Sequence, residues 1–324
     1  MCIRDRSTIV ERGRPNIVFK IAGNSPAAID ITRELESLGI GTNNTVTYTV
    51  SQEARLILAK MEGMAGALKK GIHTTQTYET NMGGRLEDHL REVLAAELIK
   101  KALEKYEDKL GVLASLAGKL GVPVENVEGP WIAETGWGYK VTARTLDEKV
   151  ELVSCRAYLK PLVKEPFVEF LASAGVEGKT PEEVRKSLEE WETALGYAGT
   201  LVAQRVWWIF FSPENRRKWL AFLIKKYNLK PEEAEEILDN IDVLPASKRK
   251  PLDTYLTLAY NNITNTEFPD HQLKVLETAK QKNFLLAKFK NSIMLKHDPQ
   301  IVKKLMKLED FKKAYELTPH LAEI

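Results

Sequence analysis

The chain has 324 residues, and its 47 lysines and arginines almost balance its 45 aspartates and glutamates. A formal net charge of +2 gives no electrostatic reason to expect nucleic acid or an anionic membrane as a partner. The two cysteines, Cys2 and Cys155, do not form a disulfide framework pattern, so a reducing cytoplasm is the expected location. No apolar run approaches the roughly 20 residues of a membrane span, and residues 1–6 lack the apolar centre of a secretory signal.

The first predicted element is a short buried strand at residues 17–22. This apolar run, I-V-F-K-I-A, lies between turn signals on both sides and contains one lysine, Lys20. Ser25 is placed to cap the following helix, with Pro26 at its first position, and two glycines end that helix at Gly39 and Gly41.

Strands and helices then alternate. Residues 42–50 are dense in Thr, Val and Tyr and predict a second strand, followed by a helix from Ser51. Residues 72–80 predict a third strand, and 86–105 a long helix. This alternation indicates an α/β fold with a parallel sheet, either a barrel or a doubly wound sheet.

The middle of the chain is less regular. Residues 121–159 contain a Thr/Val-rich segment that predicts a small β excursion. The charged segment 161–195 predicts helices, one of them with Thr180 as N-cap and Pro181 at its first position. The strongly apolar segment 199–211 is also predicted to be helical, and after Pro231 the chain is mostly helical apart from 241–246.

Lys20 is the residue that first suggests chemistry. A lysine within an apolar strand loses hydration, which favours the free amine and permits attack on a carbonyl. In a parallel barrel, residues near the carboxyl ends of strands line the active site. The alternative for Lys20 is a strand-end lysine whose ammonium group reaches solvent.

The surrounding residues resemble the transaldolase family. Residues 14–22 read R-P-N-I-V-F-K-I-A, similar to the family segment R-P-N-x-x-x-K-I-P/A, in which the lysine forms a Schiff base from strand four of a (β/α)8 barrel. Residues 39–49 read G-I-G-T-N-N-T-V-T-Y-T and resemble the family's second block, matching Asn43 to its active-site asparagine and Thr45 to its threonine. Residues 80–88 resemble the third block, S-P-F-x-G-R-x-x-D, with Thr80 at the serine and Arg85 at the phosphate-binding arginine.

Later similarities to the family are looser. Residues 198–211 resemble the helix after strand six, and 263–268 resemble a T-E-x-x-F stretch near the family's C-terminus. Strand seven is expected at 219–228, where the usual A-S-x-R pattern does not occur, so that Lys225 and Lys226 are the available substitutes for a second phosphate-binding arginine. Strand eight is expected at 242–245.

The chain also departs from the family. Only about sixteen residues precede the lysine strand, so strands one to three of the barrel, with their proton-transferring Asp and Glu, are expected to be missing through an N-terminal truncation. The stretch between Arg85 and Gly199 is longer than the family needs. We therefore expect barrel units four to six at 1–120, an inserted subdomain at 121–197, and the rest of an incomplete TIM-type barrel with C-terminal helices at 198–324.

The resemblance implies transfer of a dihydroxyacetone unit between phosphosugars in the pentose phosphate pathway, with Lys20, Asn43 and Thr45 as catalytic residues and Thr80 and Arg85 as substrate and phosphate ligands. It implies no cofactor, and the histidines show no metal-ligand spacing, so no metal is expected. The expected partners are small phosphosugars, with a homo-oligomer left open. The alternatives are an aldolase that releases the three-carbon unit to water, and a non-catalytic phosphosugar-binding or scaffold protein.

Overall fold

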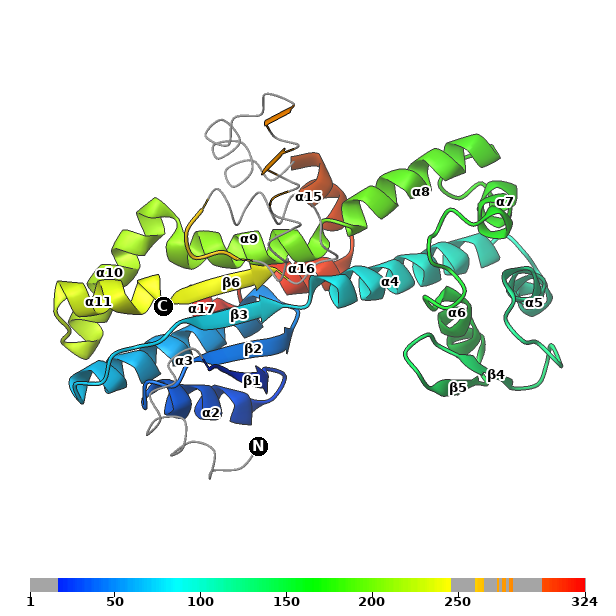
Figure 1. The fold of residues 1–324 in the computed structure, drawn as a ribbon. Coiled ribbons are helices and arrows are strands. Elements are labelled where there is room, and N and C mark those ends of the chain that lie inside the picture. The colour runs from blue at the N-terminus through cyan, green and yellow to red at the C-terminus, as the bar shows by residue number, and fades with distance from the viewer. Residues whose placement is uncertain are drawn as a thin grey trace. The chain divides into compact units, whose positions relative to one another are not determined.

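The computed structural model describes residues 17–245, 260–264 and 299–323, together with positions 273, 276–277 and 280–281. The chain divides into two compact units. The first comprises Met1–Gly84, Ala198–Gln300 and Phe311–Ile324, and the second Arg85–Tyr197 and Ile301–Asp310. Figure 1 gives the labels of the elements in both units.

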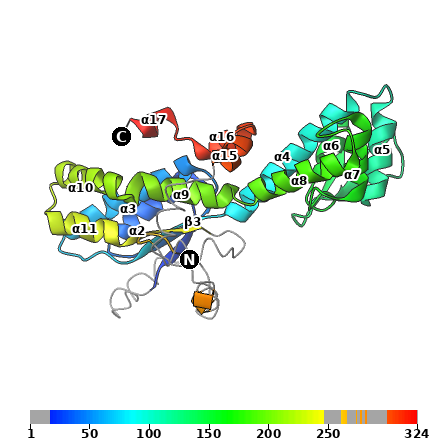
Figure 2. The same cartoon turned by 90° about the horizontal axis from the view of Figure 1, so that it is seen from above.

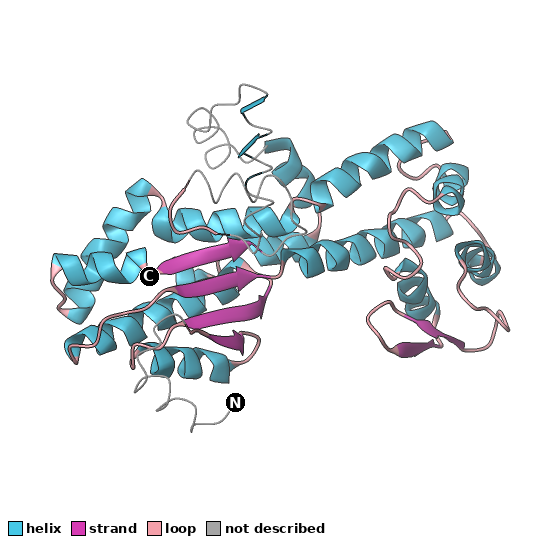
Figure 3. Cartoon of the chain, in the orientation of Figure 1, coloured by secondary structure: helices cyan, strands magenta, loops and turns pink. Residues whose placement is uncertain are grey.

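A four-stranded parallel sheet forms the centre of the first unit (Figure 3). Its strands are β1 (Phe19–Ala22), β2 (Thr42–Thr47), β3 (Thr77–Asn81) and β6 (Ile241–Pro245). They lie in the order β1-β2-β3-β6, and all three neighbouring pairs are parallel. Beyond β6, Ile263 forms an isolated parallel bridge with Val243. The order in space therefore follows the order in the chain without a reversal.

Helices cover one face of this sheet (Figure 2). The helices of the first unit are α2 (Pro26–Glu36), α3 (Val50–Lys69), α9 (Ala198–Phe211), α10 (Pro213–Tyr227), α11 (Pro231–Asp239) and α17 (Pro319–Ala322). Helices α2, α3, α9 and α11 contact the strands, and α10 packs on α3, α9 and α11. Helix α3 supplies much of the core, because its Leu56, Ile57, Met61 and Met64 are almost fully buried.

Local sequence signals set the ends of these helices. Pro26 lies at the start of α2 after Ser25, whose side chain makes no capping hydrogen bond. Helix α3 begins with a capping box, in which Thr49 and Gln52 each accept from the other's backbone N–H. Helix α10 ends at Asn228, which has a left-handed backbone conformation.

The second unit is helical apart from one hairpin. Its elements are α4 (Gly83–Leu103, whose first two residues belong to the first unit), α5 (Lys109–Leu120), β4 (Trp131–Glu134), β5 (Lys140–Ala143), α6 (Leu146–Ser154), α7 (Glu165–Ala174) and α8 (Pro181–Leu195). Strands β4 and β5 pair in antiparallel fashion. The buried carboxylate of Asp88 forms ion pairs with Arg91, Arg156 and Lys160 at 2.7, 3.1 and 2.7 Å. The last two helices to be named, α15 (Pro299–Leu305) and α16 (Glu309–Tyr315), each contribute residues to both units.

The α/β class with a parallel sheet is confirmed. The strands expected near 17–22, 42–50, 72–80 and 241–246 are present, although the third begins only at Thr77. Helix α8 begins as expected, with Thr180 as N-cap and Pro181 in its first turn. Within the part of the chain that the structure describes, no helix has both the length and the apolar character needed to cross a membrane.

The expected strand seven at 219–228 is wrong. These residues lie in α10 and its C-cap, because Pro213 starts a helix there and Trp219 and Leu223 repeat at helical spacing on one face of that helix. In the sheet, no strand lies between β3 and β6. The two strands pair directly, from Thr77 with Ile241 to Asn81 with Pro245. The segment expected as strand eight, β6, is therefore the direct neighbour of β3 in the sheet.

Candidate functional site

The two faces of the sheet have different surroundings. Thr42 and Asn44 of β2 face the helices, since their side chains hydrogen-bond to Glu36 and Thr32 of α2. Successive residues of a strand point to opposite faces. Asn43 therefore lies on the other face of the sheet, which we call the open face because none of the described helices packs on it.

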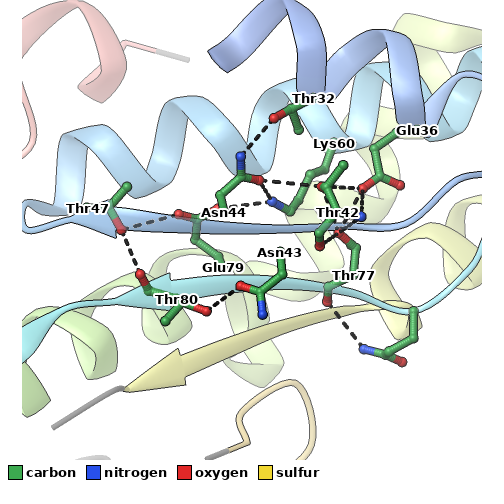
Figure 4. Close-up of polar contacts among 11 residues, drawn as sticks. Thr32, Glu36, Thr42, Asn43, Asn44, Thr47, Lys60, Thr77, Glu79 and Thr80 are labelled. Atoms are coloured by element: carbon green, nitrogen blue, oxygen red, sulfur yellow. Dashed lines mark hydrogen bonds and ion pairs between the residues drawn. The ribbon is translucent and has the colours of Figure 1, made fainter. Parts of the chain in front are cut away.

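Lys20, Asn43 and Thr80 come together on the open face. Lys20 of β1 is the register partner of Asn43 in β2, so their Cα atoms are separated by about 5 Å, the usual spacing of paired strands. The hydroxyl of Thr80 in β3 donates to the side-chain oxygen of Asn43 at 2.6 Å (Figure 4). The Asn43 oxygen is thus held by Thr80. No residue in the described part of the chain accepts from the amide N–H groups of Asn43, which are donors beside Lys20. Lys20 itself is exposed on its strand.

Thr45 follows Asn43 by two residues and is 8% exposed. Directly after it, Val46 has a φ of 61°, a left-handed conformation that is rare for a β-branched residue. The pairing of β2 with β3 changes register between Asn44 and Thr47. The carboxyl end of β2 is therefore bent at the position where the expected site residues lie, and such strained positions occur frequently at functional sites.

The open face also contains two residues that the sequence did not single out. Tyr78 of β3 is the register partner of Asn43, and Asp242 of β6 is the partner of Tyr78. Lys20, Asn43, Tyr78 and Asp242 thus form one row across four strands. Burial raises the pKa of Asp242 to about 6, and burial together with the nearby Asp242 carboxylate raises the pKa of Tyr78. The signal in the sequence is a single acidic residue within the apolar strand I-D-V-L-P.

Arg85 belongs to the second unit and is exposed near the start of α4. Its guanidinium carbon lies 5.9 Å from the centroid of the Trp137 ring, on the turn of the β4–β5 hairpin. The guanidinium carbon of Arg156 lies closer to that ring, at 4.4 Å. Of the five expected site residues, the first unit therefore contains Lys20, Asn43, Thr45 and Thr80, and Arg85 lies in the other unit.

The expected substitutes for a second phosphate-binding residue are not placed at a strand end. Lys225 and Lys226 lie in the last turn of helix α10, and the ammonium of Lys226 contacts the rings of Phe222 and Tyr227 at 4.9 and 5.4 Å. In a βαβ unit, the carboxyl end of the helix lies at the amino ends of the strands, away from the edge where ligands bind.

The A-S-x-R pattern, which does not occur at 219–228, occurs after β6. Residues 246–249, immediately after β6 in the sequence, read A-S-K-R. β6 is the strand that follows β3 in the sheet. Residues 246–249 lie outside the described residues, as do residues 14–16 of the first block and 265–268 of the looser match.

A buried polar layer lies between the sheet and helices α2 and α3 (Figure 4). The ammonium of Lys60 from α3 is fully buried, donates to the side-chain oxygen of Asn44, and forms an ion pair with Glu79 at 3.1 Å. The Thr47 hydroxyl donates to the backbone carbonyl of Thr80 at 2.9 Å. Since Thr80 holds Asn43 on the open face, this layer fixes the strands that present the site.

Three carboxyl groups in this region are buried. Burial raises the pKa of Glu36 to about 7, although Lys60 and the hydroxyl donors Thr42 and Thr77 act in the opposite direction. Burial also raises the pKa of Glu79, partly offset by Lys60. The pKa of Glu53 lies well above its usual value, because burial is reinforced by the charge of Glu79. The sequence signal was Lys60 itself, a cation within the apolar stripe of a helix.

Chemically, the open face offers an amine, an amide held in one orientation, two threonine hydroxyls and a carboxyl group with a raised pKa. This set can form a covalent bond to a carbonyl and donate hydrogen bonds to the hydroxyls of the bound molecule. No family model, curated protein or solved structure matches the chain.

Proposed function

We propose that this chain acts on phosphosugars by Schiff-base chemistry of the transaldolase type, with Lys20 as the nucleophile. The observation that carries the proposal is the register pairing of Lys20 with Asn43, together with the 2.6 Å hydrogen bond from Thr80 to Asn43. Three residues from three separate sequence blocks that resemble the same family thus meet on one face of one sheet.

We also propose that the sheet is a sector of a (β/α)8 barrel. A parallel sheet whose strand order follows the chain, with helices on one face, is singly wound, whereas a doubly wound sheet reverses its order and has helices on both faces. The parallel bridge from Ile263 to Val243 continues the same order by one further strand. In this assignment β1, β2, β3 and β6 are strands four to seven, and Ile263 begins strand eight.

The proposed reaction begins when the Lys20 amine attacks the ketose carbonyl. The carbinolamine loses water to give an imine. The C4 hydroxyl then gives its proton to water, and the C3–C4 bond breaks with its electron pair delocalised into the imine while C4 becomes the aldehyde carbon. An aldose leaves, and the three-carbon unit stays bound to Lys20 until an aldose phosphate accepts it. The amide of Asn43 donates to a hydroxyl of this unit, and Thr45 orients water or a carboxyl group. No external electron sink is required, since the imine supplies one.

Substrate contacts are assigned from the resemblance. Thr80 contacts the sugar, and Arg85, four residues after the end of β3, binds the terminal phosphate. A guanidinium can donate two parallel hydrogen bonds to a phosphate. Arg249 of the A-S-K-R segment is the second phosphate ligand in this proposal, in place of Lys225 and Lys226.

Product analysis tests the proposed reaction. Fructose 6-phosphate is incubated with the chain in the presence and absence of erythrose 4-phosphate, and the products are separated. A transaldolase forms sedoheptulose 7-phosphate and glyceraldehyde 3-phosphate only when both sugars are present. Free dihydroxyacetone without an acceptor identifies an aldolase instead. Sugar binding without any product identifies a phosphosugar-binding protein and contradicts both enzymatic forms.

A further inference from the structure

Glu53 is a buried carboxyl group to which the proposed reaction gives no role. It lies in the first turn of helix α3, about two turns before Lys60, so that the two side chains share one side of the helix. Its contact in the sheet is Asn81, the last residue of β3, whose amide Nδ2 donates to Oε1 of Glu53 at 2.6 Å. Glu53 and Asn81 are both 0% exposed, so bulk water does not reach either side chain.

Each of these two side chains has one oxygen without a hydrogen-bond partner. Oε2 of Glu53 and Oδ1 of Asn81 are buried, and neither bonds to any residue that the structure describes. Buried polar atoms in this state are rare, because each one keeps the full cost of losing water. A carboxylate has only acceptors, so an ionised Glu53 leaves both oxygens unpaired. A carboxylic acid has one O–H donor, and a proton on Glu53 can therefore serve both atoms at once.

The balance of charge around Glu53 also favours a neutral side chain. Glu36, Glu53 and Glu79 are all buried in the polar layer between the sheet and its helices, where Lys60 is the one buried cation among the described residues. Lys60 forms its ion pair with Glu79, at 3.1 Å. One ammonium group balances one carboxylate, so a second carboxylate beside Glu79 would remain unpaired in the interior, which is strongly unfavourable.

The charged groups that act on Glu53 do not cancel the effect of burial. Burial is the largest cause that raises the pKa of Glu53, and the charge of Glu79 on β3 adds to it. The hydrogen bond from Asn81 and the charge of Lys60 act in the opposite direction. Glu36 on α2 also interacts with Lys60, and none of the charged residues described on α9, α10, α11 and α17 acts on Glu53. The amino end of a helix favours a negative charge, but this effect is small beside the cost of an unpaired buried carboxylate.

Asn81 connects this buried pair to the proposed site. It directly follows Thr80, whose hydroxyl holds the side chain of Asn43 on the open face. On its other side the chain continues to Gly83, and a Cβ atom on Gly83 would lie 3.0 Å from Oδ1 of Asn81. The amide of Asn81 is therefore enclosed at the point where the chain leaves the sheet, and its hydrogen bonds determine how the end of β3 is held.

We propose that Glu53 is an uncharged carboxylic acid at neutral pH and that its O–H donates to Oδ1 of Asn81, which positions the carboxyl end of β3. Glu53 is a positioning residue, since it contacts no substrate and acts through Asn81 on the strand that presents Thr80. The consequence for Thr80 rests on the proposed function, whereas the proton on Glu53 and its effect on β3 do not. The proton takes the place of a second cation in the polar layer.

Infrared difference spectra of the whole chain at pH 8 test for the proton. The C=O stretch of a carboxylic acid lies above the amide band, in a region where a carboxylate does not absorb. Subtracting the spectrum of Glu53→Gln from that of the parent chain should leave one carboxylic acid band, which shifts in D2O. Glu62→Gln removes an exposed carboxyl group from the same helix and should leave a carboxylate signal instead. A carboxylate signal with Glu53→Gln as well would overturn the proposal.

Amide hydrogen exchange tests the positioning of β3. Glu53→Gln keeps a donor for Oδ1 of Asn81 and an acceptor for its Nδ2, so exchange in β3 should stay close to that of the parent chain. Glu53→Leu removes both partners and should speed exchange in β3 by roughly tenfold or more, as expected for the loss of a buried hydrogen-bonded pair. Exchange in β1 is the internal control and should change less. Equal acceleration in both strands would mean general destabilisation and would contradict a positioning role.

Glu53→Gln decides the case even if Glu53→Leu does not fold. If Glu53 were ionised, glutamine would remove a charge that balances Lys60, and exchange in β3 would rise. None of these measurements uses turnover. If the acid band is present and no sugar is trapped on Lys20, the proposed function alone is contradicted, and the reverse result contradicts the role of Glu53 alone.

Discussion

At the scale of single residues, the chemistry of the open face depends on which polar atoms can contact a bound molecule. Thr80 donates to the side-chain oxygen of Asn43, and among the described residues nothing accepts from the Asn43 amide N–H groups, which can therefore donate to a ligand. The neighbouring Lys20 is exposed rather than enclosed. Its proposed role therefore rests on its position beside Asn43 and not on a buried pocket around its amine.

Arg85 gives a prediction that separates phosphate recognition from bond formation. Arg85→Ala should lower kcat/KM for fructose 6-phosphate by roughly two to three orders of magnitude, because a charge-assisted phosphate contact is lost. Unphosphorylated fructose or dihydroxyacetone should be affected little. Steady-state kinetics with both kinds of substrate measure the difference.

Arg55→Ala serves as the control for general loss of positive charge, because Arg55 is an exposed arginine on helix α3. If Arg85→Ala lowers the rates with phosphorylated and plain sugars by the same factor, Arg85 does not bind the phosphate. Its contact with the Trp137 ring at 5.9 Å would then be its main role.

Glu36 gives a prediction about pH. Its pKa in the folded chain is about 7, compared with an ordinary value of 4.5, so the folded chain binds more protons than the unfolded chain between these values. The free energy of unfolding therefore decreases as pH rises from about 4.5 to about 7. Glu36→Gln keeps an oxygen that accepts from Thr42 and Thr77 and removes this titration.

Urea unfolding at pH 5 and pH 8 measures the effect. The stability of Glu36→Gln relative to the parent chain should increase between the two pH values, by up to about 3 kcal/mol for the full shift. Glu323→Gln, which changes an exposed carboxyl near the C-terminus, should show no such change. A constant difference between Glu36→Gln and the parent would mean that Glu36 titrates normally in the folded chain.

At the scale of elements, a close backbone approach connects helix α9 to the end of β3. Gly199 lies in the first turn of α9 against Gly83, and a Cβ atom on Gly83 would lie 2.7 Å from the Cα of Gly199. Both positions therefore require glycine for steric reasons. This close approach holds the start of α9 against Gly83. Gly83 follows the end of β3 in the sequence and is therefore near Thr80 and Asn81.

Two glycine variants test this packing. Gly199→Ala should destabilise the chain by roughly 1–3 kcal/mol, since the new methyl group meets backbone that has little room to move. Gly118→Ala, also within a helix, has no atom within 4 Å of the new Cβ. It should instead stabilise the chain by about 0.5–1 kcal/mol through helix propensity. Thermal and urea unfolding compare the two, and equal effects would contradict the close approach.

At the scale of the whole molecule, the sequence predicted the parallel α/β sheet and most of its elements. Turn residues beside an apolar run were sufficient for β1, the density of Thr, Val and Tyr for β2, and Thr180 with Pro181 for the start of α8. The strand predicted at 219–228 followed from the strand count of the family, although Pro213 and the spacing of Trp219 and Leu223 indicate a helix. The A-S-K-R segment follows β6 instead.

The polar layer and the row on the open face could not be predicted in the same way. Lys60, Asn44 and Glu79 come from three elements, and no local pattern relates them before the register is known. Asp242 joins Lys20 only through three successive strand pairings. The sequence predicted Lys20, Asn43 and Thr80 as members of one site, and the sheet register places the three residues on one face of the sheet.

The most direct test of the central claim is reductive trapping. The chain is treated with borohydride in the presence of fructose 6-phosphate, and peptides are mapped by mass spectrometry. The proposal predicts a reduced three-carbon or sugar adduct on Lys20, absent without the sugar and absent in Lys20→Arg, while the exposed Lys69 and Lys70 of the same unit stay unmodified. An adduct on a different lysine, or no sugar-dependent adduct at all, would contradict the assignment of Lys20 as the Schiff-base residue.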